Sequence, residues 1–234
     1  MKNSEKNEKE QLEEVTEISL LEDLNKPPKI LEINVPIINK IRKDITNEMG
    51  NHTIATYSYT NEEGKELYRI LRRTGNGEKF LVSYIDENGL ERFKFPEKIK
   101  PVPYNLVGIR KAIENNQIIW IVEGESKADT MNKMGFTCTS CPFKKPDKWS
   151  PAYNKYLEGA KGIIILQDND YNGMLFAEYT SESILDSVEN IELSVIRMDE
   201  ICHSIKEGGD IDDLIDIFGV KTVKKNLKDI EAQF

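Results

Sequence analysis

The sequence has 234 residues, with 32 basic and 41 acidic side chains, so its formal charge is −9. Its hydrophobic fraction of 38% can build a core, but no apolar run approaches the roughly 18 residues that a membrane span requires. The charged N-terminus lacks the apolar segment of a signal peptide, and three cysteines suit a reducing compartment. These features exclude a membrane-inserted chain and predict a cytoplasmic protein.

The first part of the chain is predicted to be a disordered acidic tail. Residues 1–26 contain eight acids, four lysines and few aromatic or β-branched side chains, so they cannot bury enough surface to offset chain entropy. Pro27-Pro28 ends this segment. Apolar residues at helical spacing from Ile38 to Met49 then predict one short helix.

The segment from Ala55 to Phe95 is predicted to form an antiparallel meander. It contains four runs in which polar and apolar residues alternate, which is typical of half-buried strands. The turn signals between these runs are Asn61–Gly64, Gly75–Gly77 and Asp86–Gly89. We assign this meander, with the residues around it, to a smaller α+β subdomain at 27–115.

A different alternation follows Pro101 and Pro103. Short apolar runs are each followed by an amphipathic helical pattern, which is typical of a parallel sheet covered by helices on both faces. The predicted strands are Ile118–Val122, Gly162–Leu166 and Glu192–Arg197, and the predicted helices are Leu106–Glu114, Ser126–Met134, Gly173–Leu185 and Ile211–Phe218. The fold class is therefore α/β, with its main domain at 116–220 and a C-terminal helix or tail at 221–234.

Acidic residues follow each predicted strand. The three motifs are Glu123-Gly-Glu125, Asp168-Asn-Asp170 and Gly208-Gly-Asp210-Ile-Asp212-Asp213. The carboxyl ends of parallel strands meet at one edge of a sheet, and carboxylates packed there repel unless they are protonated or coordinated. A hard cation resolves this repulsion, so the motifs predict metal-assisted phosphoryl transfer. Each motif alone also fits helix capping, but the three together favour a catalytic site.

The order of these motifs resembles the Toprim domain shared by primases, topoisomerases and some nucleases. Upstream, the stretches Ala55-Thr-Tyr-Ser-Tyr59, Tyr68-Arg69 and Val102-Pro-Tyr-Asn-Leu106 resemble the N-terminal half of the catalytic core in DnaG-like primases of phages, plasmids and mobile elements. The resemblance covers about residues 50 to 218. It implies a nucleotidyltransferase that makes short RNA primers from ribonucleoside triphosphates on a single-stranded DNA template.

The resemblance also implies roles for individual acidic residues. Glu123, Asp168, Asp170 and Asp210 are implied to be catalytic residues that bind Mg²⁺ or Mn²⁺, with Asp212 as a further metal ligand. Gly173 matches a family glycine, whose missing side chain would let the next helix pack close to its strand.

Lys127 departs from the family pattern. The family often reads Glu-Gly-Glu-Lys-Asp-Ala, whereas this chain reads Glu123-Gly-Glu-Ser-Lys127-Ala, so a lysine stands where an acid is common. We expect Lys127 to pair with a neighbouring carboxylate or with nucleotide phosphate. A lysine at this position puts the full set of metal ligands in question.

The meander is predicted to bind the template. Residues 65–100 carry nine Lys or Arg against six acids, and such charges attract nucleic-acid phosphates in a salt-dependent way. The predicted contacts are Arg69, Arg72, Arg73, Lys79, Arg92 and Lys94. Arg72 and Lys79 are favoured because they flank a predicted turn. Aromatic side chains of the strands could stack on bases, but strand spacing favours core positions for most of them; they are Tyr57, Tyr59, Tyr68, Tyr84, Phe93 and Phe95.

Alternatives remain beside this interpretation. Cys138-Thr-Ser-Cys141 with Cys202-His203 has zinc-ligand spacing, but paired Cys-x-x-Cys knuckles are missing from the sequence. The sequence contains neither a zinc ribbon nor a Gly-x-x-x-x-Gly-Lys-Ser/Thr loop, so we expect a replicative helicase or another replication protein to act in trans. The same acids would also serve a Toprim nuclease, and a non-catalytic nucleic-acid-binding replication module is a third possibility.

Overall fold

The computed structural model describes residues 52–75, 79–142 and 149–234. The predicted acidic tail and the predicted helix ending near Gly50 lie outside these residues. The chain divides into two compact units, and nearly all described residues belong to the second, which comprises Thr53–Arg73 and Glu78–Phe234.

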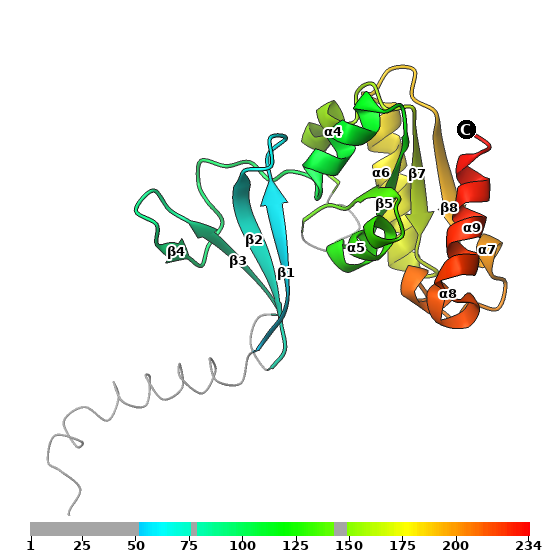
Figure 1. The fold of residues 1–234 in the computed structure, drawn as a ribbon, viewed down its shortest axis with the longest axis horizontal. Coiled ribbons are helices and arrows are strands. Elements are labelled where there is room, and N and C mark those ends of the chain that lie inside the picture. The colour runs from blue at the N-terminus through cyan, green and yellow to red at the C-terminus, as the bar shows by residue number, and fades with distance from the viewer. Residues whose placement is uncertain (1–51, 76–78, 143–148) are drawn as a thin grey trace, which may run out of the picture. The chain divides into compact units, whose positions relative to one another are not determined.

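The predicted antiparallel meander is present as a four-stranded sheet (Figure 1). Its strands, in sheet order, are β1 (Thr53–Thr60), β2 (Glu66–Arg73), β3 (Phe80–Ile85) and β4 (Glu91–Arg92). The turns at 61–64 and 86–89 close through backbone hydrogen bonds of 3.0 Å, from the Gly64 N–H to the Asn61 carbonyl and from the Gly89 N–H to the Asp86 carbonyl. The turn signals therefore placed these connections correctly.

Most aromatic side chains of this sheet belong to the core. Tyr59 and Tyr68 are fully buried and stack with ring centroids 4.7 Å apart. Tyr84 and Phe95 pack against the same core, whereas Phe93 is 59% exposed. The preference for core positions over stacking platforms is confirmed for all but Phe93.

The second sheet is parallel and also has four strands, in the order β6-β5-β7-β8. The strands are β5 (Ile118–Val122), β6 (Thr137–Thr139), β7 (Gly162–Gln167) and β8 (Leu193–Arg197). The two central strands, β5 and β7, are buried along nearly their whole length, as expected for unbroken apolar runs covered on both faces. The predicted α/β architecture is confirmed, and β6 is an additional edge strand of three residues.

Helices cover both faces of the parallel sheet (Figure 1). They are α4 (Leu106–Glu114), α5 (Glu125–Lys133), α6 (Tyr171–Leu185), α7 (Met198–Ile201), α8 (Ile211–Phe218) and α9 (Val220–Glu231), with a 3-10 helix η1 (Pro151–Tyr156). One core joins α4, α6 and η1 to one face of the sheet and includes the tyrosines of β1 and β2. A second core joins α5, α8 and α9 to the opposite face.

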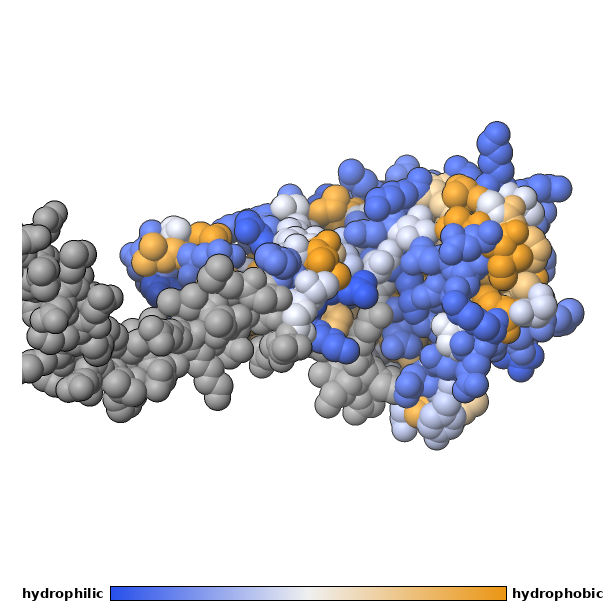
Figure 2. Space-filling view, turned by 90° about the horizontal axis from the view of Figure 1, so that it is seen from below, coloured by the Kyte–Doolittle hydropathy of each residue, from blue (hydrophilic) through white to orange (hydrophobic). Residues whose placement is uncertain are grey.

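The face seen in Figure 2 is largely polar. Figure 2 shows hydrophilic residues over much of one face, with hydrophobic residues gathered mainly at one end. Within the described part of the chain, no helix is both long and apolar enough to cross a membrane.

Candidate active site

The predicted acidic motifs lie at the carboxyl ends of the parallel strands. Glu123 directly follows β5 and Asp168 directly follows β7, and these two strands are hydrogen-bonded neighbours. Gly124 makes the turn from β5 into α5 with a φ of 100°, a conformation that residues with a side chain rarely adopt. The edge of the sheet therefore presents both carboxylates together.

Asn169 brings the third acidic motif to the same edge. Its backbone N–H donates to the Gly209 carbonyl at 2.9 Å, and the Gly208 N–H donates to the Asn169 carbonyl at 2.8 Å. The Asn169 side-chain amide donates to two further carbonyls in the loop before Gly208. Asp210 comes directly after the two glycines that form these backbone hydrogen bonds. Asn169 was missing from the predicted site residues because its partners lie far away in the sequence.

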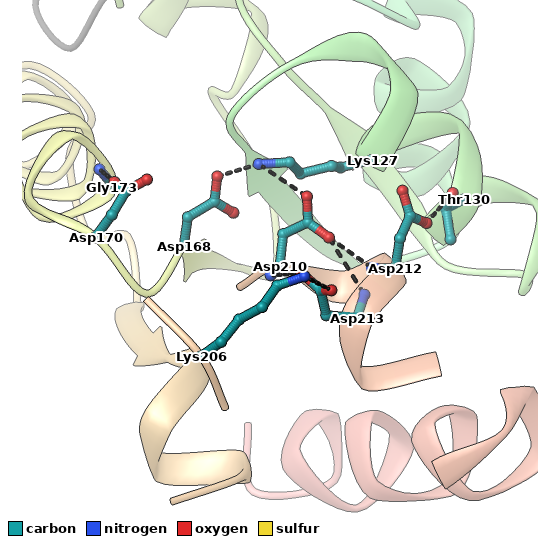
Figure 3. A network of polar contacts seen from close by, with 9 residues as sticks. All are labelled: Lys127, Thr130, Asp168, Asp170, Gly173, Lys206, Asp210, Asp212 and Asp213. Carbon is teal, nitrogen blue, oxygen red and sulfur yellow. Dashed lines mark hydrogen bonds and ion pairs between the residues drawn. The ribbon is translucent and has the colours of Figure 1, made fainter. Parts of the chain in front are cut away.

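Three of the predicted metal ligands already accept hydrogen bonds near helix ends (Figure 3). Asp170 caps α6 by accepting from the Gly173 N–H at 2.6 Å. Asp210 caps α8 by accepting from the Asp212 N–H at 2.9 Å. Asp212 accepts from the Thr130 hydroxyl of α5 at 2.9 Å. Helix capping and a place in the acidic site thus coexist in Asp170 and Asp210.

Lys127 lies between two of the carboxylates (Figure 3). Its ammonium forms an ion pair with Asp168 and lies 3.6 Å from an Asp210 carboxylate oxygen. Lys127 is only 8% exposed. Burial alone would lower its pKa, but the charge of Asp168 and the hydrogen bond to it outweigh burial, so the pKa of Lys127 is raised. The lysine is therefore a firmly charged group, and the expected carboxylate pairing is confirmed.

Asp168 is the most deeply buried of the predicted ligands. It is 5% exposed, and its Oδ1 has no hydrogen-bond partner among the described residues. Burial raises the pKa of Asp168 to about 6, although the charge of Lys127 opposes the shift. The nearby negative charges of Glu123 and Asp210 add to the increase. Glu123 is therefore close enough to share the electrostatics of the site.

The raised pKa of Asp168 predicts a pH-dependent stability. Between about pH 4 and pH 6 the folded protein holds a proton on Asp168 that the unfolded chain has lost, so raising the pH lowers the free energy of unfolding. The loss should total on the order of 3 kcal/mol. The stability advantage of the wild type over Asp168→Asn should shrink by this amount between pH 4 and pH 7 in urea denaturation. If the free energies of unfolding of the two proteins changed with pH in parallel, the raised pKa of Asp168 would not be the cause.

The chemistry of the donors fits a hard cation in part. Within residues 52–75, 79–142 and 149–234, no three His, Cys, Asp or Glu side chains are arranged to hold a metal ion. However, Oδ1 of Asp168 is a buried oxygen without a partner among these residues, and carboxylate oxygens are the ligands that Mg²⁺ prefers. Glu123 and Asp168 are the residues that would hold such an ion. Lys127 occupies the space between Asp168 and Asp210.

Gly173 permits the close approach that the sequence predicted. A Cβ added to Gly173 would lie 2.5 Å from the carbonyl oxygen of Asp168 and 2.9 Å from the Asp168 Cβ. Both distances are far inside normal van der Waals contact. Any side chain at this position would therefore push α6 away from the loop that carries Asp168.

Two tyrosines hold α5 from outside the parallel sheet. The Tyr59 hydroxyl, on β1, donates to the buried Glu125 carboxylate at 2.7 Å. The Tyr104 hydroxyl donates to Asp129 at 2.8 Å. Burial and the adjacent carboxylate raise the pKa of Tyr59, so it remains a proton donor. These contacts fix the helix that carries Lys127, and the sequence pattern alone did not reveal them.

Five of the six predicted template contacts fall into two groups, and the sixth, Arg73, is partly buried. Arg69, Arg92 and Lys94 form ion pairs with Glu66, Asp86 and Glu97, at 2.7, 2.7 and 2.9 Å. Arg72 and Lys79 are exposed and have no ion pair among the described residues. The strand register places Arg72 opposite Phe80, the neighbour of Lys79. The two favoured residues therefore lie at the same end of the β2–β3 pair.

Several solved structures with a similar fold are domains of DNA primases. A DNA primase domain from Pseudomonas aeruginosa matches with a TM-score of 0.56 and 18% identity, over 74% of this chain and 50% of that chain. The zinc-binding and RNA polymerase domains of the Aquifex aeolicus primase match with a TM-score of 0.54 and 15% identity, over 85% and 48%. A DnaG primase catalytic domain bound to ssDNA matches with a TM-score of 0.51 and 16% identity, over 73% and 52%.

These matches concern the fold, since all three identities are low. The chain spans about half the length of the solved chains that it matches. No protein-family model matches the sequence. A search of the curated proteins also finds no match.

Proposed function

We propose that this chain is the catalytic core of a DNA primase, which synthesises short RNA primers on single-stranded DNA. The observation that carries the proposal is the position of Glu123, Asp168 and Asp210 at one edge of the parallel sheet, within a fold that DNA primase catalytic domains share. Ligands of open parallel sheets bind at this edge. The resemblance to Toprim primases of phages, plasmids and mobile elements supports a role in replicating such an element.

Each residue of the site has its own role in the proposed nucleotidyl transfer. Glu123 and Asp168 would hold Mg²⁺ or Mn²⁺, which supplies Lewis-acid stabilisation of the nucleotide phosphates when bound. Lys127 places a fixed positive charge beside them, and such preorganised charge favours phosphate groups that gain negative charge during reaction. The caps formed by Asp170 and Asp210 fix the backbone on which these groups stand.

The exposed basic residues of the antiparallel sheet, Arg72 and Lys79, are proposed to bind the template. Replacing both Arg72 and Lys79 with Gln should weaken binding of a fluorescent oligo-dT and reduce the slope of log K against log salt concentration by about 1 to 1.5. The matched control replaces both Lys224 and Lys225 with Gln, because these two lysines are exposed on α9 and lie outside the antiparallel sheet. Fluorescence anisotropy over a series of salt concentrations measures both effects. An unchanged salt slope in the Arg72 and Lys79 double variant would place the template elsewhere.

One gel tests the proposed activity. The protein is incubated with end-labelled single-stranded DNA, ribonucleoside triphosphates (one of them labelled) and Mg²⁺ or Mn²⁺, with and without a replicative helicase. Labelled RNA products of several nucleotides are expected. Shortened DNA would instead identify a nuclease that uses the same carboxylates, and an unchanged substrate in every lane would leave only nucleic-acid binding.

A further inference from the structure

The position of Lys127 within α5 is unfavourable in free energy when the lysine is considered by itself. Lys127 is the third residue of this helix, and the N-terminus of a helix favours negative charge because the backbone N–H groups point outward there. Burial of an ammonium group adds a desolvation cost. Both costs are offset only if the carboxylates that face the lysine supply a strong compensating charge.

The lysine in turn offsets the repulsion between the carboxylates of Asp168 and Asp210. Asp168 and Asp210 come from different loops, and both approach the same ammonium group (Figure 3). Without a cation between them, these two carboxylates would repel each other, and Asp168 is buried, so water screens this repulsion only weakly on its side. The lysine therefore does what a bound cation would do for this pair.

The surroundings keep Lys127 in place. Tyr59 holds α5 at Glu125, two residues before the lysine, and Tyr104 holds it at Asp129, two residues after. The Thr130 hydroxyl of the same helix donates to Asp212, in the first turn of α8. The ammonium is thus a preorganised part of the site and not a mobile surface group.

We propose that Lys127 is a built-in cation that replaces one divalent ion, so that the site binds at most one Mg²⁺ or Mn²⁺. The remaining position would use Glu123 and the Oδ1 of Asp168, which has no hydrogen-bond partner in the described part of the chain. This inference deepens the proposed function and rests on it for the role of the metal. Lys127 acts here as a positioning residue that sets how many ions the carboxylates accept.

The test compares Mn²⁺ binding by the whole wild-type chain with that of Lys127→Met. Isothermal titration calorimetry gives stoichiometry and affinity, and thermal unfolding with and without Mn²⁺ gives an independent readout. Lys206→Met is the matched control, because Lys206 pairs with Asp213 in the same acidic region but its side chain is 69% exposed. It removes the same charge from the surface and not from the interior of the site.

Lys127→Met is expected to gain one Mn²⁺ site or to bind Mn²⁺ at least about 10-fold more tightly than the wild type, because removing the ammonium raises the net negative charge of the ligands. Mn²⁺ should also raise its Tm by at least about 5 °C, since the ion replaces the lost charge. Lys206→Met should stay within about 3-fold of the wild-type affinity. Equal Mn²⁺ binding by Lys127→Met and the wild type would overturn the proposal.

The wild type alone provides a second test if Lys127→Met fails to fold. Wild-type protein should bind no more than one Mn²⁺, and two bound ions would overturn the proposal without any variant. Neither measurement requires primer synthesis. A protein that makes no primers but shows these binding differences would therefore refute the proposed function and support the role of Lys127.

Discussion

Glu123→Gln and Asp168→Asn should each reduce primer synthesis by at least about 100-fold; Glu123→Gln should leave the fold intact, whereas Asp168→Asn should also lower stability, because it removes the main charge partner of buried Lys127. Each change keeps the shape of the side chain but removes a negative charge from the edge of the sheet. In the proposed mechanism these two carboxylates hold the divalent ion, so a neutral amide weakens the group that stabilises phosphate charge. Incorporation of labelled ribonucleotides on a single-stranded template measures the loss.

Asp216→Asn is the control for these two variants. Asp216 is an exposed acid of α8 in the same acidic part of the chain, and it is not among the proposed ligands. It should retain nearly full activity. Wild-type rates of primer synthesis in folded Glu123→Gln or Asp168→Asn protein would remove these residues from the catalytic site.

Gly173→Ala is expected to destabilise the protein by about 2 to 4 kcal/mol. Alanine is intrinsically the better helix former by up to about 1 kcal/mol, so helix propensity alone predicts the opposite sign. The close approach decides the result: the new methyl group would lie 2.5 Å from a backbone oxygen of Asp168, and backbone cannot move aside as a flexible side chain can. Urea denaturation measures the change.

Asn172→Ala tests the same turn of α6 without the steric clash. Asn172 is exposed, so its replacement should change the free energy of unfolding by no more than about 0.5 kcal/mol. Gly173→Ala should also lose activity, because displacement of α6 shifts the loop that carries Asp168. A Gly173→Ala protein as stable as the wild type would show that α6 does not need this close contact.

The sequence predicted the parallel sheet well because its central strands are unbroken apolar runs. Ile118–Val122 can be buried on both faces only in a covered sheet, and the acids that follow it mark the strand end. By contrast, Thr137–Thr139 is too short to show any periodicity, so β6 was not predicted. Pattern length therefore decided which strands could be recognised.

The acidic residues of the site could be predicted from the sequence, whereas the residues that hydrogen-bond to them could not. Glu123 and Asp168 were identified from their place after strands, a local feature of the sequence. The bond from Asn169 to Gly209, and that from Tyr59 to Glu125, join segments that only the folded chain brings together. Likewise, the ion pair of Arg92 with Asp86 depends on the turn geometry at 86–89. Long-range polar contacts carry no periodic signal.

The shared core on one face of the parallel sheet has a practical consequence for dissecting this protein. Tyr57 and Tyr59 of β1 lie in the same cluster as Ile119 and Ile121 of β5. A fragment cut at residue 116 would expose that cluster to water and would lose the hydroxyl that donates to Glu125. Truncation at this point would thus yield an aggregation-prone piece, and assays of separated halves would misrepresent the intact protein.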